Sequence, residues 1–258
     1  MYTEQLINVR KTVPLVQCIT NNVTILDCAN ALLAAGASPT MSHAWQEARE
    51  VQHGCSALVL NLGATESFKA MELAAAEAHE CGHPVVLDPV GVGGSSYRRD
   101  FMKEMISAGF IDCIRGNAAE IASAVRGEAT VTGVDEPQDA HPDFLHLDYP
   151  SDHETAAFAS EHGLIVVRSG VRDYITDGKK ELICTAGDPM MKRITGTGCM
   201  SSCIIAAFMA SNKTEGPDAV LAACEYFGEC GKKAAEKTRA ACGGTMTFRQ
   251  KLIDALSF

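Results

Sequence analysis

The sequence is short of the features that mark several specialised classes of protein. Basic residues are outnumbered: 22 Lys and Arg stand against 32 Asp and Glu, for a formal net charge of -10 in 258 residues. A nucleic-acid-binding domain usually shows a basic patch or stripe, so this balance argues against a nucleic-acid partner. An acidic exterior is explained by solubility, and an anionic substrate would need positive charge gathered at one place.

Long apolar runs and paired cysteines are also missing. No stretch reaches the ~18 consecutive apolar residues of a membrane-spanning helix, and the opening MYTEQLINVRK has no apolar signal segment. We therefore expect no membrane partner. The 11 cysteines are odd in number, scattered and without a Cys-x-x-Cys pair, which argues against a disulfide framework and against zinc. Buried, reduced thiols predict a cytoplasmic protein.

Short apolar runs alternate with longer amphipathic stretches along most of the chain. Strands are predicted over residues 15–19, 57–61, 84–88, 112–114 and 164–169, with helices over 23–35, 66–81, 97–108, 118–125 and 155–162. This alternation is typical of βαβ units and a mainly parallel sheet. Runs such as PVVLD and LIVVRS are apolar on both faces, which indicates a sheet covered by helices on both sides.

The remaining segments fit the same single α/β domain over residues 1–258. Strands over 174–176 and 181–184 flank Asp177-Gly178, a hairpin signal, and helices are predicted over 200–210, 217–238 and 248–256. Residues 127–153 are rich in proline and acidic residues and show little periodicity. So long a loop is unusual in a compact domain, and we interpret it as an insertion.

Polar residues and glycines follow five of the predicted strands. In open α/β sheets, ligands bind beyond the carboxyl ends of the strands. These ends therefore predict a lined crevice, and they read Thr20-Asn21-Asn22, Asn61-Leu62-Gly63, Asp88-Pro89-Val90-Gly91, Arg115-Gly116-Asn117 and Ser169-Gly170.

The strongest single motif is Thr195-Gly196-Thr197-Gly198-Cys199, which precedes an apolar helix. Two glycines at a helix start expose successive N–H groups, and the helix dipole adds partial positive charge, so the motif can form an anion site. A tight loop entering a core helix explains it equally well. The P-loop pattern is absent. A dinucleotide turn over 196–201 would need an acid at a strand end, whereas Asp218 opens a helix.

Four further residues are candidates for chemistry, and three of them also have a structural interpretation. Cys199 lies in the first helical turn, where the dipole favours a thiolate, but most cysteines of the chain are inert. Asp88 is either a turn former or a metal-associated carboxylate. Arg115 at a strand end can clamp a phosphate with its planar fork of donors. Glu120 completes a capping-box spacing with Asn117, and proximity to Mg²⁺ is its alternative role.

Seven blocks in order make the sequence resemble the hydroxyethylthiazole kinase family of thiamine salvage, within the ribokinase-like superfamily. They are PLVQCITNNVT, ALLAAGASPTM, LVLNLGA, LDPVGVGGSSYRR, IRGNAAEI, VVRSGVRDYITDG and ITGTGC. The resemblance implies a three-layer αβα sandwich with a mainly parallel central sheet, assembled as a homotrimer with active sites between subunits. It also implies transfer of the ATP γ-phosphate to the primary alcohol of 4-methyl-5-(2-hydroxyethyl)thiazole.

The resemblance also implies roles for individual residues. Thiazole-binding positions are Asn21, Met41 and Gly196; ATP-binding positions are Arg115 and Ser169; Asp88 and Glu120 lie near Mg²⁺; and the catalytic segment is Gly196, Thr197, Gly198 and Cys199. Cys199 occupies the position of a catalytic aspartate in most ribokinase relatives, either as a base or as an orienting group. A dinucleotide-dependent oxidoreductase and a non-catalytic thiazole or thiamine sensor remain the alternatives.

Overall fold

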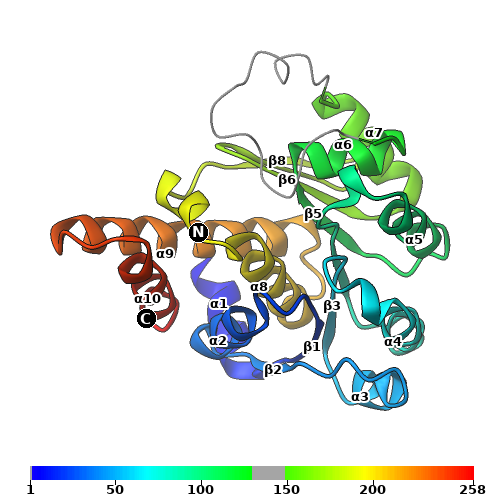
Figure 1. Cartoon of the computed structure of the whole chain (residues 1–258), viewed down its shortest axis with the longest axis horizontal. Coiled ribbons are helices and arrows are strands. Elements are labelled where there is room, and N and C mark those ends of the chain that lie inside the picture. The colour runs from blue at the N-terminus through cyan, green and yellow to red at the C-terminus, as the bar shows by residue number, and fades with distance from the viewer. Residues whose placement is uncertain (1, 130–148) are drawn as a thin grey trace.

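A computed structural model describes residues 2–129 and 149–258, which form helical layers on both faces of one sheet (Figure 1). The sheet has the strand order β2-β1-β3-β4-β5-β6-β7-β8. Its first six strands in this order are parallel, and β7 and β8 join as an antiparallel hairpin. The strands are β1 Leu15–Ile19, β2 Ser38–Thr40, β3 Ala57–Asn61, β4 Val85–Asp88, β5 Cys113–Asn117, β6 Ile165–Ser169, β7 Asp173–Thr176 and β8 Glu181–Cys184.

The helices divide between the two faces according to the core to which they contribute. Helices α1 Thr3–Thr12, α2 Ile25–Ala35, α8 Thr197–Ser211, α9 Pro217–Ala240 and α10 Thr245–Leu256 share one core with the sheet. Helices α3 Ala48–His53, α4 Phe68–Cys81, α5 Ser96–Ser107, α6 Ala118–Arg126 and α7 Asp152–His162 share the other, on the opposite side of the strands (Figure 1). The predicted three-layer sandwich with a mainly parallel sheet is therefore confirmed.

Three elements escape the sequence patterns. Helix α1 buries only Leu6 and Val9, so its apolar stripe is too thin to predict a helix. Strand β2 is the three-residue segment Ser-Pro-Thr at the sheet edge, and proline is typical of edge strands rather than central ones. Helix α3 has six residues, which is too short for a clear helical period.

The predicted insertion over 127–153 falls largely outside the described residues, and its boundary is wrong at the carboxyl end. Asp152 and His153 belong to α7. Ser151 caps that helix: its hydroxyl accepts a hydrogen bond from the Glu154 N–H at 3.1 Å, and the Glu154 carboxylate accepts one from the Ser151 N–H at 2.8 Å. This capping box starts the helix three residues before the predicted start at Thr155.

Helix α8 is the central helix of its layer. Every side chain from Cys199 to Phe208 is buried, which is the pattern of a helix enclosed on all sides. It packs against α2, α9 and strand β3. Since its position is fixed by this burial, the glycine turn at its start is held at the carboxyl edge of the sheet. Among the described residues, no helix is long and apolar enough to cross a membrane.

Removing a large side chain from α8 tests this role. Phe208 is fully buried and stacks on Tyr226 with ring centroids 5.6 Å apart. We expect Phe208→Ala to lower the free energy of unfolding by about 3–5 kcal/mol in urea titrations, because the cavity removes both burial and packing. Phe258, which is 87% exposed, supplies the control: Phe258→Ala should change it by less than about 0.5 kcal/mol. Equal losses from both variants would contradict the assigned core.

Candidate active site

The carboxyl ends of the parallel strands bring polar side chains together at one edge of the sheet. The register pairs Asn61 of β3 with Asp88 of β4, and Asn117 of β5 with Ser169 of β6. Arg115 lies two residues before the end of β5. The predicted crevice is therefore lined by side chains from adjacent strands, as this fold class requires.

Asn61 connects three of the predicted site residues. Its Nδ2 donates to the Asp88 carboxylate at 2.7 Å and lies 3.2 Å from the Cys199 Sγ. Its Oδ1 accepts from Asn21 Nδ2 at 3.1 Å and from the Gly63 N–H at 2.9 Å. The sequence motifs place Asn61 at a strand end but give it no role, because an uncharged amide between charged candidates offers no chemical signal by itself.

The glycine turn depends on two close approaches. Gly196 caps α8 with φ +91°, and a Cβ there would lie 2.8 Å from Thr24 Cγ2. Thr24 is held in turn by Asn21, whose Oδ1 accepts from the Thr24 N–H at 3.1 Å. A Cβ at Gly198 would lie only 2.5 Å from Arg115 Nη1. Glycine at 198 is therefore what lets the guanidinium lie against the first turn of the helix.

Positive charge is concentrated at this point. The first N–H groups of a helix have no partner within it, and they carry the positive end of the dipole. The Arg115 guanidinium lies beside them, and its buried Nε has no hydrogen-bond partner among the described residues. Thr197 anchors the turn through a hydrogen bond from Oγ1 to the Met191 carbonyl at 3.1 Å. An arrangement of this kind binds an anion.

Two buried carboxylates balance this charge. Asp88 is 2% exposed and Glu120 is 8% exposed. Burial raises the pKa of Asp88, and the Arg115 charge opposes that shift. Burial, together with the Asp88 charge, raises the pKa of Glu120 to about 7. Glu120 also accepts from the Asn117 N–H at 2.9 Å, so its capping box is real.

The environment of Cys199 differs from the one that the helix start alone predicts. The side chain is buried, and burial together with the Asp88 charge raises the pKa of its thiol well above the ordinary value. The expectation of a favoured thiolate is therefore wrong for the free protein, because desolvation and a neighbouring carboxylate outweigh the helix dipole. The nearby Asn61 and Asn21 Nδ2 atoms, at 3.2 and 3.7 Å, donate toward the sulfur.

Ser169 and Met41 lie at the ends of strands on opposite sides of β3 and β4, which carry Asn61 and Asp88. The Ser169 hydroxyl donates to the Gly116 carbonyl at 3.0 Å, next to Arg115 in the chain. Met41 follows the edge strand β2 and is half-buried. His43 joins it to the end of β1: its Nδ1 lies 2.6 Å from the Met41 carbonyl oxygen and its Nε2 lies 2.8 Å from that of Thr20. No sequence motif singles out His43.

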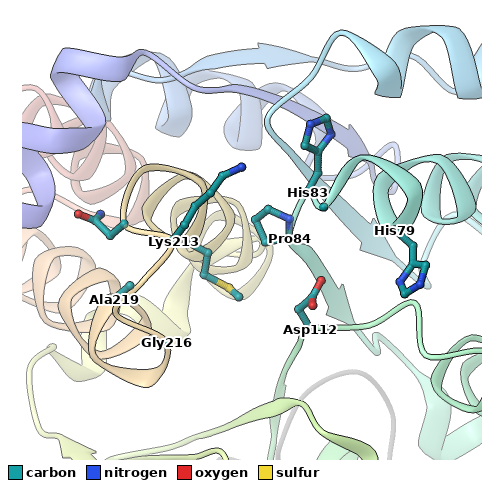
Figure 2. A pocket seen from close by; sticks show the side chains of 10 residues that line it. His79, His83, Pro84, Asp112, Lys213, Gly216 and Ala219 are labelled. Atoms are coloured by element: carbon teal, nitrogen blue, oxygen red, sulfur yellow. The ribbon is translucent and has the colours of Figure 1, made fainter.

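A cavity of about 250 Å³ lies at the opposite edge of the sheet, and none of the predicted site residues lines it (Figure 2). Its lining includes Pro84 and Asp112, which precede β4 and β5, together with His79, His83 and Lys213. The Asp112 carboxylate already accepts from the Val85 N–H at 2.8 Å. The dinucleotide interpretation gains nothing from the fold, since Asp218 opens α9 and pairs with Lys180.

The raised pKa of Glu120 predicts how stability depends on pH. A carboxyl whose pKa is higher in the folded state binds its proton more tightly there. Its contribution to stability therefore declines as the pH rises from the ordinary pKa of 4.5 to about 7. Glu120→Gln keeps the capping geometry without a charge. In urea titrations at pH 8 without divalent cations, we expect the free energy of unfolding of this variant to exceed that of the parent by up to about 3 kcal/mol.

Glu154→Gln is the matched control for this measurement. Glu154 also completes a capping box, but its hydrogen bonds to Ser151 lower its pKa. Its replacement should leave stability at pH 8 unchanged or slightly reduced. A Glu120→Gln protein less stable than the parent at pH 8 would show that Glu120 is not held at an electrostatic cost.

Comparison with known proteins agrees with the sequence blocks. The hydroxyethylthiazole kinase family model matches residues 6–258. A hydroxyethylthiazole kinase from Methanocella arvoryzae is 37% identical over 253 residues, covering 97% of this chain and 90% of the relative. The structure of a hydroxyethylthiazole kinase protein from Pyrococcus horikoshii is 34% identical, with a TM-score of 0.84 over 99% of this chain and 92% of that one. A ribokinase-like superfamily protein from Enterococcus faecalis shares the fold, with a TM-score of 0.63 at 13% identity over 94% of this chain and 86% of that one. The chain belongs to the hydroxyethylthiazole kinase family.

Proposed function

We propose that this protein transfers the γ-phosphate of ATP to the primary alcohol of 4-methyl-5-(2-hydroxyethyl)thiazole. The observation that supports this most is the meeting of Arg115 with the start of α8, where a Cβ at Gly198 would fall 2.5 Å from Nη1. In a chain of net charge -10, this local positive charge suits a phosphate. Family membership supplies the substrate class.

Each part of the site then has a role in positioning or in charge stabilisation, which together account for most of phosphoryl-transfer catalysis. Arg115 and Ser169 hold the ATP phosphates. The N–H groups of Thr197, Gly198 and Cys199 stabilise charge on the phosphoryl group in transit. Because these donors are fixed by a buried helix, they need little reorganisation during the reaction.

Asp88 and Glu120 suit a magnesium ion. Both are buried carboxylates whose pKa is raised partly by burial, and oxygen donors of this kind are the ligands Mg²⁺ prefers. When bound, the ion would neutralise charge on the ATP phosphates. Without it, the Arg115 guanidinium is the counter-charge that lowers the pKa of both acids.

The thiazole alcohol occupies the side of the site nearest β1 and β2. Asn21, Met41 and Gly196 contact it, with Asn21 held by its hydrogen bonds to Asn61 and Thr24. We further propose that residues 1–258 act as one domain in a cytoplasmic homotrimer. Its active sites lie between subunits.

Cys199 orients the alcohol, and because its thiol is already protonated, the proton of the alcohol passes late in the reaction to an oxygen of the transferred phosphoryl group. Because its pKa is raised, the Cys199 thiol is uncharged when the reaction starts and does not act as a base. A loose transition state makes little demand on a base, because the bond from the γ-phosphorus to the departing ADP is largely broken before the alcohol oxygen bonds to that phosphorus. The sulfur lies beside Asp88 and Asn61, which set its orientation.

Incubation of the purified protein with Mg·ATP and the thiazole alcohol tests the proposed reaction. Mass spectrometry should detect the phosphorylated alcohol. Gly198→Ala should lower kcat/KM at least about tenfold without lowering the melting temperature, since alanine favours the helix but displaces Arg115. Gly244→Ala, where a Cβ would meet no atom within 4 Å, is the control. Thiazole binding by the folded parent without turnover would instead support the sensor.

Two substitutions at Cys199 separate its roles. Cys199→Asp should retain or raise kcat, because a carboxylate can both orient the hydroxyl and accept its proton. Cys199→Ala should lower kcat by about tenfold or more. Cys203→Ala, one helical turn further into the core, controls for packing and should leave kcat nearly unchanged in folded protein. If Cys199→Ala turned over as fast as the parent, Cys199 would have no part in the reaction.

A further inference from the structure

Three metal-ligating side chains meet where α3 packs on α4, away from the proposed active site. They are His53, the last residue of α3, and Glu77 and Cys81, one turn apart on α4. The His53 Nδ1 lies 2.9 Å from Glu77 Oε1, and the Cys81 Sγ lies 3.7 Å from each of these atoms. One imidazole, one carboxylate and one thiol thus face a common point.

The spacing of these atoms fits a four-coordinate transition metal. With metal–nitrogen and metal–oxygen distances near 2.1 Å and metal–sulfur near 2.3 Å, tetrahedral geometry separates nitrogen from oxygen by roughly 3.4 Å and sulfur from either by roughly 3.6 Å. The observed separations of 2.9, 3.7 and 3.7 Å differ from these by a few tenths of an ångström. Small side-chain rotations would therefore complete the site.

Neighbouring charges hold the carboxylate in the required orientation. Arg49 Nε donates to Glu77 Oε2 at 2.9 Å, which leaves Oε1 turned toward His53 and Cys81. Arg49 also donates to Glu80 at 2.8 Å. Arg49 therefore acts as an outer group that orients a ligand, as found around many metal sites. With Cys81 ionised, the four charged side chains and a divalent cation sum to zero.

We propose that His53, Glu77 and Cys81 form a binding site for a divalent transition metal of the zinc class, with the fourth position open to solvent. Mixed nitrogen, oxygen and sulfur donors select such a metal over Mg²⁺ and Ca²⁺. The His53 side chain is 74% exposed, so an ion can reach the cluster. On binding, Cys81 forms a metal–sulfur bond and releases its proton to solvent.

The bound metal would pin the end of α3 to α4. Helix α3 is short and follows the segment that carries Met41 and His43. The metal would therefore restrain the connection that runs from β2 through α3 to the next strand. The spacing of the cysteines in the sequence argues against a zinc site, because it contains no Cys-x-x-Cys pair. The cluster arises because Glu77 and Cys81 share one face of α4 and helix packing brings His53 to it.

Titration with Co²⁺, followed by displacement with Zn²⁺, tests the proposal without reference to catalysis. The purified full chain should bind one Co²⁺ with a thiolate-to-cobalt charge-transfer band and the visible bands of four-coordinate cobalt. Stoichiometric Zn²⁺ should abolish these bands, whereas a large excess of Mg²⁺ should not. Zn²⁺ should also raise the melting temperature. Absence of a thiolate band in the parent protein would overturn the proposal.

Matched variants assign the ligands. Cys81→Ser should remove the charge-transfer band, whereas Cys242→Ser should keep it; Cys242 is exposed, and the other cysteines are buried. His53→Ala should weaken Zn²⁺ binding at least about tenfold, whereas His79→Ala, an exposed position also on α4, should not. A band that survives Cys81→Ser, or equal affinity for Zn²⁺ in His53→Ala and parent, would contradict the assignment.

Discussion

The contact between the Arg115 guanidinium and the first turn of α8 is the interaction on which the site depends. Two positive features, a side-chain cation and the amino terminus of a helix, lie directly against each other. This is possible because residue 198 has no Cβ. Such a cluster is costly unless negative charge balances it. Asp88 and Glu120 provide that charge in the free protein, and Arg115 lowers the pKa of both against the effect of burial. A phosphate and a divalent cation would redistribute the same charges without creating a new imbalance.

The fold fixes this arrangement with its most buried parts. Helix α8 is enclosed on all sides over Cys199 to Phe208, so its first turn has little freedom to move. The parallel strands end at the same edge and present Asn61, Asp88 and Arg115 in adjacent positions. Asn61 then joins the acid, the thiol and Asn21 in one hydrogen-bond network. Rigidity of this kind is what charge stabilisation in a transition state requires.

Periodicity and strand-end composition predict the layers, the parallel sheet and the β7–β8 hairpin at its edge, because these follow from local patterns along the chain. They cannot predict the meeting of Arg115 with Gly198, which depends on how α8 crosses the sheet. The raised pKa of Cys199 cannot be predicted from these patterns for the same reason, since its burial and its carboxylate neighbour are tertiary features. The roles assigned to Ser169 and Met41 rest on resemblance and stay predictions. The cluster around His53 shows the same limit, because its ligands come from two helices with no motif in common.

The central claim is that the glycine-bent start of α8 and Arg115 together receive the terminal phosphate of the nucleotide. A crystal structure of the protein with Mg²⁺, a non-hydrolysable ATP analogue and the thiazole alcohol tests it most directly. The account predicts the terminal phosphate within hydrogen-bond distance of the N–H groups of residues 197–199 and of the Arg115 guanidinium, with the alcohol oxygen beside Cys199. A nucleotide bound with its terminal phosphate remote from these groups would contradict it.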